Sequence, residues 1–453
     1  MTPAATSPRG FVLAAGMALI LMCAVGVTVL LATAALFSDK QRGSDLSDAA
    51  ALSVATWYAQ AMNYQAYANR AIIANEVMIA QSLTLLSWIK HLETITRNTG
   101  QVAALFPALS GVSAWLQQAT VATRGLAQVA VVSEVPFRSA YTRALQASQE
   151  AMQLAANPFA TQSLVNEVIW SGDPRFFGQY LPTSDVSRFY RSVRSFGGAD
   201  RQLQAQHILE QLDAFSRSRG FDQRLYLLPS TGCVPTSVNT LFSRLVRRGG
   251  TALTQDFREW ESVDTLSVHR WQRGRGWFRV TCRGISESFP LGWGSAQAAT
   301  PVDAGLMAQA GTAANGQALA RARSEGSAIT GYLGLSGYRD LSDQSAVGRR
   351  QATFRIPILV RLTDGKRLAP AATEAVNRLV RLGGEFNPAQ ADGFLGKAVW
   401  AVSVGQVSFV DPTSGPIEHL PSLFMPFWNA NLTALSVEDQ AAAMLVAGRR
   451  TGP

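Results

Sequence analysis

The sequence predicts an α+β protein. It would have a single N-terminal transmembrane helix that continues into a helical stem and a helix-rich half, followed by a mainly antiparallel, β-containing C-terminal half. Three observations predict this fold. Residues 11–37 are apolar or small, and no charged residue occurs between Arg9 and Asp39. No proline occurs between Pro8 and Pro107. Strand-like alternation of apolar and polar residues begins near the middle of the chain.

Residues 11–37 form the predicted membrane segment. As a helix with a rise of about 1.5 Å per residue, this run reaches roughly 40 Å, enough to cross a bilayer. The apolar part of a signal peptide is only about 7–15 residues long, so an uncleaved anchor is favoured. The small residues Ala32 and Ala34 would also suit a cleavage site, and cleavage stays open. Because a large domain can be exported whatever the flanking charges, we expect residues 1–10 to be a short cytoplasmic tail.

Residues 38–100 form the predicted helical stem. Gly43 could let it kink, and Asp45 and Asp48 would suit the start of a renewed helix, because first-turn N–H groups favour negative charge. Polar residues then recur along the helix. They indicate either a helix packed against its own domain or a partner helix, including a copy of itself, or a polar stripe dedicated to one partner protein. These partner-interaction candidates are Asn63, Asn69, Arg70, Asn75 and Glu76.

Residues 101–220 form a predicted helical region. Four residues that disfavour a helix interior are expected to divide its first part into three or four shorter helices. They are Pro107, Gly111, Pro136 and Pro158. A further helix is expected over 200–218.

Residues 221–430 form a predicted β-rich periplasmic region. Segments with alternating or β-branched residues are expected to be strands. They are 224–228, 278–288, 353–362 and 399–410, the last being either a strand pair or one bent strand with Gly405 at the bend. Pro357 lacks a backbone donor and therefore predicts that its strand lies at a sheet edge.

Residues 295–344 are rich in Ala, Gly and Ser, and predict a long mobile insertion within the β-rich region.

Residues 422–428 include several aromatic side chains that we expect to dock into the core or against the stem. Three of these are further partner-interaction candidates: Phe424, Phe427 and Trp428. Residues 431–453 form the predicted C-terminal tail, with a last helix over 436–445.

The net charge is +9, carried almost entirely by arginine. The charge is not clustered tightly enough to indicate a nucleic-acid partner. Region 188–283 contains sixteen Arg against eight acidic residues. A solvated basic face is the ordinary interpretation, and binding of anionic lipid or an envelope polymer is the alternative.

Cys233 and Cys282 are the two cysteines outside the membrane segment, and we expect them to form a disulfide in an exported protein. The alternative is two buried free thiols. Cys23 lies within the membrane segment.

The sequence contains none of the common catalytic or metal-binding motifs. It has no His-Glu-x-x-His motif, no Cys/His spacing for zinc, no phosphate-binding Walker loop and no Gly-x-Ser-x-Gly elbow. No catalytic, cofactor-binding or metal-binding residue is therefore proposed, and the chain is expected not to be an enzyme.

The N-terminal region resembles the TadE/TadG-like Flp pilus-assembly proteins of bacteria. The likeness rests on Arg9-Gly10 before the span, the charged exit 39–42, and Leu46-Ser47-Asp48-Ala49-Ala50-Ala51-Leu52, which is similar to a helix start in that family. The run 63–81 and the segment 422–428 resemble a subgroup of it. The resemblance implies an inner-membrane anchor, a periplasmic fold and other pilus-assembly proteins as partners. It does not extend to the family's von Willebrand A-type metal motif, nor to prepilin cleavage after Gly10, which would place Ala15 where Glu is needed.

Three functions follow from these observations. The leading hypothesis is a membrane-anchored, non-enzymatic assembly or scaffold component of a Tad/Flp-type pilus. The alternative is an envelope sensor or binding module that holds anionic lipid or polymer through region 188–283. The third is a periplasmic hydrolase, for which the sequence offers no constellation of catalytic residues.

Overall fold

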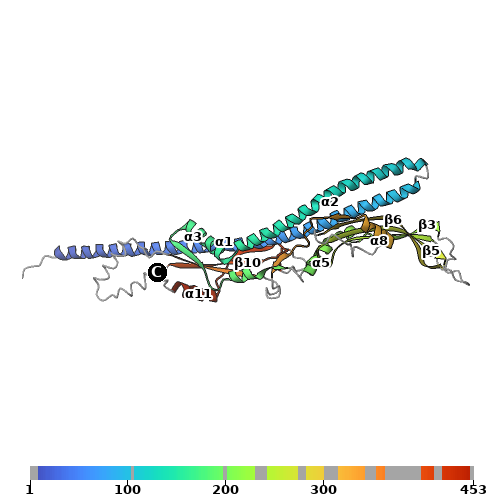
Figure 1. Cartoon of the computed structure of the whole chain (residues 1–453). Helices are drawn as coiled ribbons and strands as arrows, with labels where there is room; N and C mark the ends of the chain where they lie inside the picture. The colour runs from blue at the N-terminus through green and yellow to red at the C-terminus, as the bar shows by residue number, and fades with distance from the viewer. Residues whose placement is uncertain are drawn as a thin grey trace, which may run out of the picture. The chain divides into compact units, whose positions relative to one another are not determined.

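The computed structural model describes residues 9–103, 107–196, 201–229, 242–273, 282–299, 315–341, 353–362, 399–412 and 421–448. Over these residues the chain is an α+β protein with one long N-terminal helix and largely antiparallel sheets, as predicted (Figure 1). It divides into two compact units. Unit 1 contains 1–66, 151–194 and 341–453, and unit 2 contains 67–150 and 195–340. Each unit therefore combines segments of the predicted helical and β-rich regions.

Helix α1, Arg9–Ala103, contributes its first part to unit 1 and the rest to unit 2. A proline-free, Ala-rich sequence favours one unbroken helix over this length. The helix also continues through Gly43, where a Cβ atom would lie 3.2 Å from the ring of Phe176. This glycine therefore leaves room for a neighbouring side chain instead of ending a helix.

The sheet of unit 1 has four antiparallel strands in the order β1-β9-β10-β11. These strands are β1, Phe176–Tyr180; β9, Thr353–Leu362; β10, Trp400–Phe409; and β11, Trp428–Thr433. Helix α1 packs on this sheet so closely that a Cβ at Gly405 would clash with the carbonyl oxygen of Ala51. Gly405 thus marks a helix contact within one continuous strand.

The core of unit 1 joins the apolar face of α1 to alternating residues of β9. Ala51, Val54 and Tyr58 lie in the same buried cluster as Ile356 and Ile358. The alternation read from the sequence over 353–362 is therefore confirmed, and the opposite face of β9 packs on helix α11, Val437–Gly448.

The prediction that Pro357 places its strand at a sheet edge is wrong, because β9 lies between β1 and β10. The backbone N–H of Leu181 donates to the carbonyl of Pro357 at 3.0 Å. In an antiparallel strand the N–H and the carbonyl of one residue point to the same neighbour, so the N–H that proline lacks would also face Leu181. Leu181 is the residue after β1 ends. The missing donor consequently removes no ladder bond within the β1 pairing.

Short helices complete unit 1, and local side-chain bonds explain where they begin. Helix α3, Pro158–Gly172, has Pro158 at its first turn and Asn157 as its N-cap, whose side chain accepts from the Ala160 N–H. At the start of α11, Ser436 and Asp439 exchange side-chain-to-backbone bonds of 3.1 Å each. Helix α4, Val186–Ser192, follows β1.

The sheet of unit 2 has five strands in the order β3-β4-β5-β6-β7, antiparallel except for the parallel β6–β7 pair. The strands are β3, Phe221–Pro229; β4, Phe242–Leu253; β5, Trp260–Arg273; β6, Cys282–Ala298; and β7, Ser327–Ile329. A Cβ at Gly294 of β6 would clash with the backbone of α1 at Ser87 and His91. A strand glycine therefore admits α1 in this unit too.

Helix α2, Pro107–Ala155, is one helix, so the prediction of several shorter helices before Pro158 is wrong. Pro136 lies inside it. The carbonyl that loses its helical donor belongs to Val132, an exposed residue, so water can satisfy it. Contacts on both sides of the proline support the helix: Glu134 accepts from Ser82, and Ser139 accepts from the Leu333 N–H.

The region predicted as a helix over 200–218 forms two helices, α5, Arg201–Gln211, and α6, Ala214–Arg217. Within the predicted mobile insertion over 295–344, residues 295–298 belong to β6 and 316–324 form helix α8, Gly316–Ser324, while 300–314 and 342–344 lie outside the described residues. Asn315 caps α8 by accepting from the backbone of Gln317 and Ala318. Strand β8, Tyr338–Leu341, pairs with β2, Val193–Phe196.

Candidate functional site

The N-terminal part of α1 is long and apolar enough to span a membrane, and none of its most apolar stretch is buried in the structure. Large apolar side chains in it are mostly exposed, including Leu13, Ile20 and Leu30 at 69–70%. In a water-soluble helix such residues would face a core. The exposure therefore supports a membrane anchor at this end of the chain.

The polar residues of the predicted stem mostly make contacts within their own unit. Asn63 binds the backbone of Trp428 in both directions, donating to its carbonyl at 2.9 Å and accepting from its N–H at 3.0 Å. Asn69 is fully buried and donates to the carbonyl of Arg339. Asn75 accepts from Arg138 at 3.2 Å. These contacts support the interpretation that this helix packs against its own domain.

Arg70 differs from the other four candidates because its side chain is exposed.

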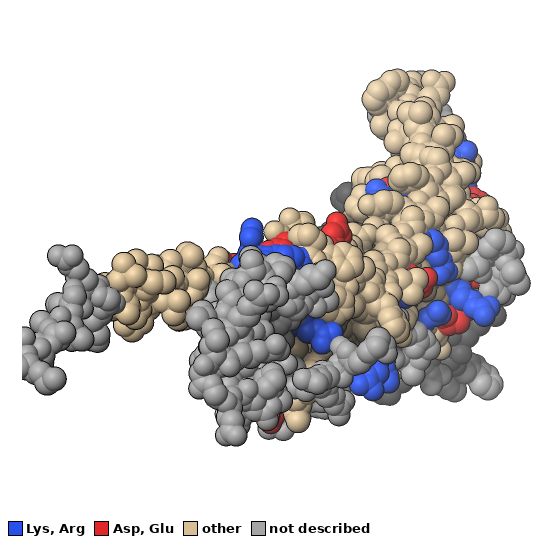
Figure 2. Space-filling model, turned by 90° about the vertical axis from the view of Figure 1, so that its left-hand side faces the viewer, with Lys and Arg blue, Asp and Glu red and all other residues tan. Residues whose placement is uncertain are grey.

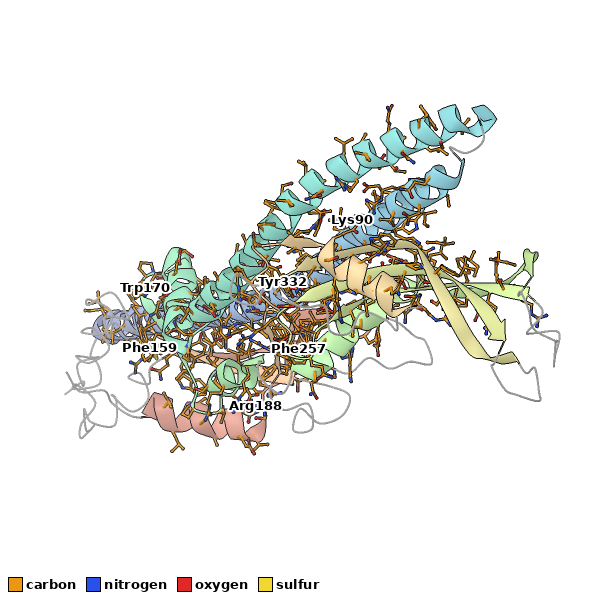
Figure 3. All side chains as sticks on the ribbon, turned by 45° about the vertical axis from the view of Figure 1, so that its right-hand side comes forward. Lys90, Phe159, Trp170, Arg188, Phe257 and Tyr332 are labelled. Atoms are coloured by element: carbon orange, nitrogen blue, oxygen red, sulfur yellow. The ribbon has the colours of Figure 1, made fainter. Side chains whose placement is uncertain are left out.

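Glu76 is buried, and its Oε2 atom accepts from Trp260 Nε1 at 3.0 Å and from the hydroxyl of Tyr332, labelled in Figure 3, at 2.9 Å. Burial raises the pKa of the Glu76 carboxyl to about 7, although both hydrogen bonds and Arg143 act to lower it. The residue therefore holds a titratable group inside the core of unit 2.

A second buried polar cluster in unit 2 surrounds Asp264 on β5. Its Oδ1 atom accepts from Arg219 Nε at 2.8 Å and from Arg247 Nη2 at 3.1 Å, and its Oδ2 accepts from Ser87 at 2.9 Å. Arg219 also donates to Ser262 at 2.9 Å, and neither Asp264 nor Arg219 exposes its side chain. The carboxylate is thus paired and hydrogen-bonded, as a buried charge requires.

Ser87, His91 and Asp264 bring together the residue types of a hydrolytic triad, but not its geometry. The Ser87 hydroxyl donates to the carboxylate itself, whereas in a triad the histidine lies between the two. All three side chains are buried, and burial lowers the pKa of His91 to about 4. The Nδ1 atom of His91 has no hydrogen-bond partner among the described residues. The arrangement fits a polar core between helix and sheet.

Lys90, labelled in Figure 3, is a buried lysine of α1 that lies next to His91 in the sequence. Its Nζ atom donates to the carbonyl of Glu325 at 3.0 Å. Burial lowers the pKa of Lys90 to about 8. The contact fixes α1 to the end of α8.

The aromatic segment 422–428 lies in the core of unit 1. Leu423 and Trp428 are buried in the same cluster as α1, and Phe427 packs against it. The rings of Phe409 and Trp428 meet edge to face with centroids 5.3 Å apart. Docking into the core is therefore confirmed, while Phe424 is half-buried.

The arginines of region 188–283 are partly used inside the fold. Arg244 pairs with Asp222, Arg248 donates to the Phe221 carbonyl at 3.3 Å, and Arg219 is buried. On the face shown in Figure 2, basic side chains lie beside acidic ones at several places. A basic face binding lipid or polymer remains a prediction.

The predicted disulfide lies outside the residues whose side chains are described, for both Cys233 and Cys282. Cys23 is a free, exposed cysteine in the apolar part of α1. Among the described residues no group of His, Cys, Asp and Glu could hold a metal ion.

Two features escaped the sequence reasoning. The Asp264 cluster was not predicted, although a lone carboxylate within the largely uncharged run 262–268 of β5 was its available signal. The other is an exposed apolar side of α2 that includes Trp115 and Leu126, and its available signal was the absence of any charged residue over 98–123.

The comparison with protein-family models finds no match for this chain, and the comparisons with curated proteins and with solved structures find none either.

Proposed function

We propose that this chain is a membrane-anchored, non-enzymatic assembly or scaffold component of a Tad/Flp-type pilus system. Its anchor would lie in the bacterial inner membrane, with the N-terminus in the cytoplasm and the bulk of the chain in the periplasm. One observation carries the proposal: helix α1 is at once an exposed apolar segment and the central helix of a folded unit. The resemblance of segments 9–10 and 46–52 to TadE/TadG-like proteins is the reason for proposing a pilus-assembly system.

The junction between anchor and fold supports a scaffold role. Leu46 and Ala50 of α1 already lie in the core of unit 1, so a continuous helix joins the apolar segment to the folded part. A flexible linker would let a binding domain move freely, whereas a continuous helix fixes its orientation to the bilayer. The partners under this proposal are the inner membrane and other pilus-assembly proteins.

An in-frame deletion tests the proposal, with surface fibres counted by electron microscopy. We expect fibres to be lost and to return with the full chain but not with residues 1–43 alone. Normal fibre number and length in the deletion strain would refute the assembly role.

A second arm tests the anchor. Ile20→Arg together with Leu21→Arg should release the chain from carbonate-washed membranes, because each arginine costs about 2.5–3.5 kcal/mol at the centre of a membrane helix. The matched control is Val437→Arg with Met444→Arg, two exposed apolar residues of α11. The control variant should stay in the membrane fraction.

A further inference from the structure

The first part of α2 exposes an apolar face within unit 2. It runs beside the last part of α1 and away from the sheet (Figures 1 and 3). Several of its large side chains are 59–75% exposed: Val112, Trp115, Leu126 and Val129. Large apolar side chains exposed together on one face, unlike single scattered ones, are typical of an interaction site.

The side of α2 that faces α1 is polar instead. Gln117 donates to the carbonyl of Thr96 at 3.3 Å, and the hydroxyls of Thr120 and Thr96 lie 3.2 Å apart. Arg124 pairs with Glu93 at 3.2 Å. A helix on the surface of a water-soluble fold normally has the reverse arrangement, with its apolar side inward. The outward face of α2 therefore has the character of a surface that is covered by an apolar partner.

The spacing along this face is that of a two-helix contact. Its positions alternate by three and four residues, which keeps them on one side of a helix and is the pattern of antiparallel and parallel helix pairs. The pattern is also symmetric by side-chain type about its midpoint, with Val, a large residue and Ala on each side. In order, these positions are Val112, Trp115, Ala119, Ala122, Leu126 and Val129.

We infer that this face of α2 docks the same face of a second copy of the chain, in antiparallel orientation. Antiparallel pairing places Val112 against Val129 of the second copy, Trp115 against Leu126, and the two alanines together at the centre. The two large residues then meet each other, the valines meet at both ends, and the small central pair lets the helices approach closely. A two-fold symmetric contact of this kind uses one surface twice, as most homodimers do.

The same symmetry favours a second copy over lipid. A bilayer surface would require only that the face be apolar, and the order of side-chain sizes would have no part in it. The inference does not depend on the proposed role in pilus assembly, because it rests on α2 alone.

Cysteine cross-linking of the full chain in isolated membranes tests the orientation. One tagged copy carries Val112→Cys and a differently tagged copy carries Val129→Cys. Antiparallel pairing predicts a disulfide between the two, identified as a linked peptide by mass spectrometry, which separates it from links through native cysteines. In a parallel pair these positions would be about 25 Å apart along the helix. A Val112→Cys copy linked only to another Val112→Cys copy would overturn the inference.

Two charge variants test the face itself. Leu126→Glu places a charge in the contact, and Val121→Glu makes the same change on the same helix outside it, at a residue 47% exposed. We expect the link between the two cysteine copies to fall at least tenfold with Leu126→Glu and to be unchanged with Val121→Glu. Equal linking in both variants, or no link in the parent pair, would refute docking of a second copy.

Discussion

Replacing Glu76 by glutamine should change how the free energy of unfolding depends on pH. The folded-state pKa of about 7 lies above the ordinary value of 4.5, because burial disfavours the charged carboxylate. Between these values the folded state holds a proton that the unfolded chain releases. The contribution of Glu76 to stability is therefore fully present below pH 4.5, and it is lost as the pH rises through 7.

The size of the effect follows from the same two values. At about 1.4 kcal/mol per pKa unit, the difference between 4.5 and about 7 corresponds to roughly 3 kcal/mol. Glutamine keeps an oxygen that can accept from Trp260 and Tyr332 but does not titrate in this range. Relative to Glu76→Gln, the wild type should thus lose up to roughly 3 kcal/mol of stability between pH 4.5 and pH 8.

The assay is urea unfolding of the full chain in detergent, followed by tryptophan fluorescence at several pH values. Trp260, one of ten tryptophans that contribute to the signal, is hydrogen-bonded to the mutated residue. Glu167→Gln, at an exposed glutamate of α3, is the control and should retain the wild-type pH dependence. If Glu76→Gln and the wild type changed in parallel from pH 4.5 to pH 8, the reasoning about burial would be refuted.

Three further predictions concern contacts within unit 1 or within unit 2. Gly405→Ala should destabilise unit 1 by at least about 2 kcal/mol in urea unfolding, because the added Cβ meets helix backbone, whereas Gly111→Ala, with nothing nearby, should be neutral or stabilising. Asn63→Ala should cost about 2 kcal/mol, because it leaves the two backbone groups of Trp428 unpaired, and a Tm within 1 °C of wild type would contradict this. Asp264→Asn should cost roughly 3–5 kcal/mol, because two arginines lose their buried counter-charge, and an unchanged urea midpoint would argue against the cluster.

The sequence was sufficient to predict the elements that one periodicity defines. Strand β9 has the predicted bounds because its alternation runs unbroken from Phe354 to Leu362. The uncharged apolar run before Asp39 likewise predicted the part of α1 that is long and apolar enough to span a membrane. Predictions from proline alone failed where tertiary contacts compensate for the missing N–H. Pro136 lies inside a helix, because residues on both sides of it bond to other elements. Pro357 lies in an interior strand, because its missing donor faces the end of β1.

The polar residues of α1 show the limit for sites. Their recurrence along the helix indicated either internal packing or a polar stripe for a partner, and a local pattern does not tell which of the two applies. Only the positions of Trp428, Arg339 and Tyr332, all more than two hundred residues later, decide that Asn63, Asn69 and Glu76 are internal. Such long-range pairings leave no mark on a local pattern.

These distant pairings also set the order in which the protein can mature. Asn63 and its partner Trp428 are separated by 365 positions, and a ribosome adding about 5–20 residues per second needs roughly 20–70 s to make that interval. During this time α1 has already been synthesised, while the last strand of the unit 1 sheet, β11, has not. The core of unit 1, to which α1 and Trp428 both contribute, consequently stays incomplete until the end of the chain is made. Loss of a short C-terminal stretch would then prevent unit 1 from forming at all, and high contact order would make its assembly slow.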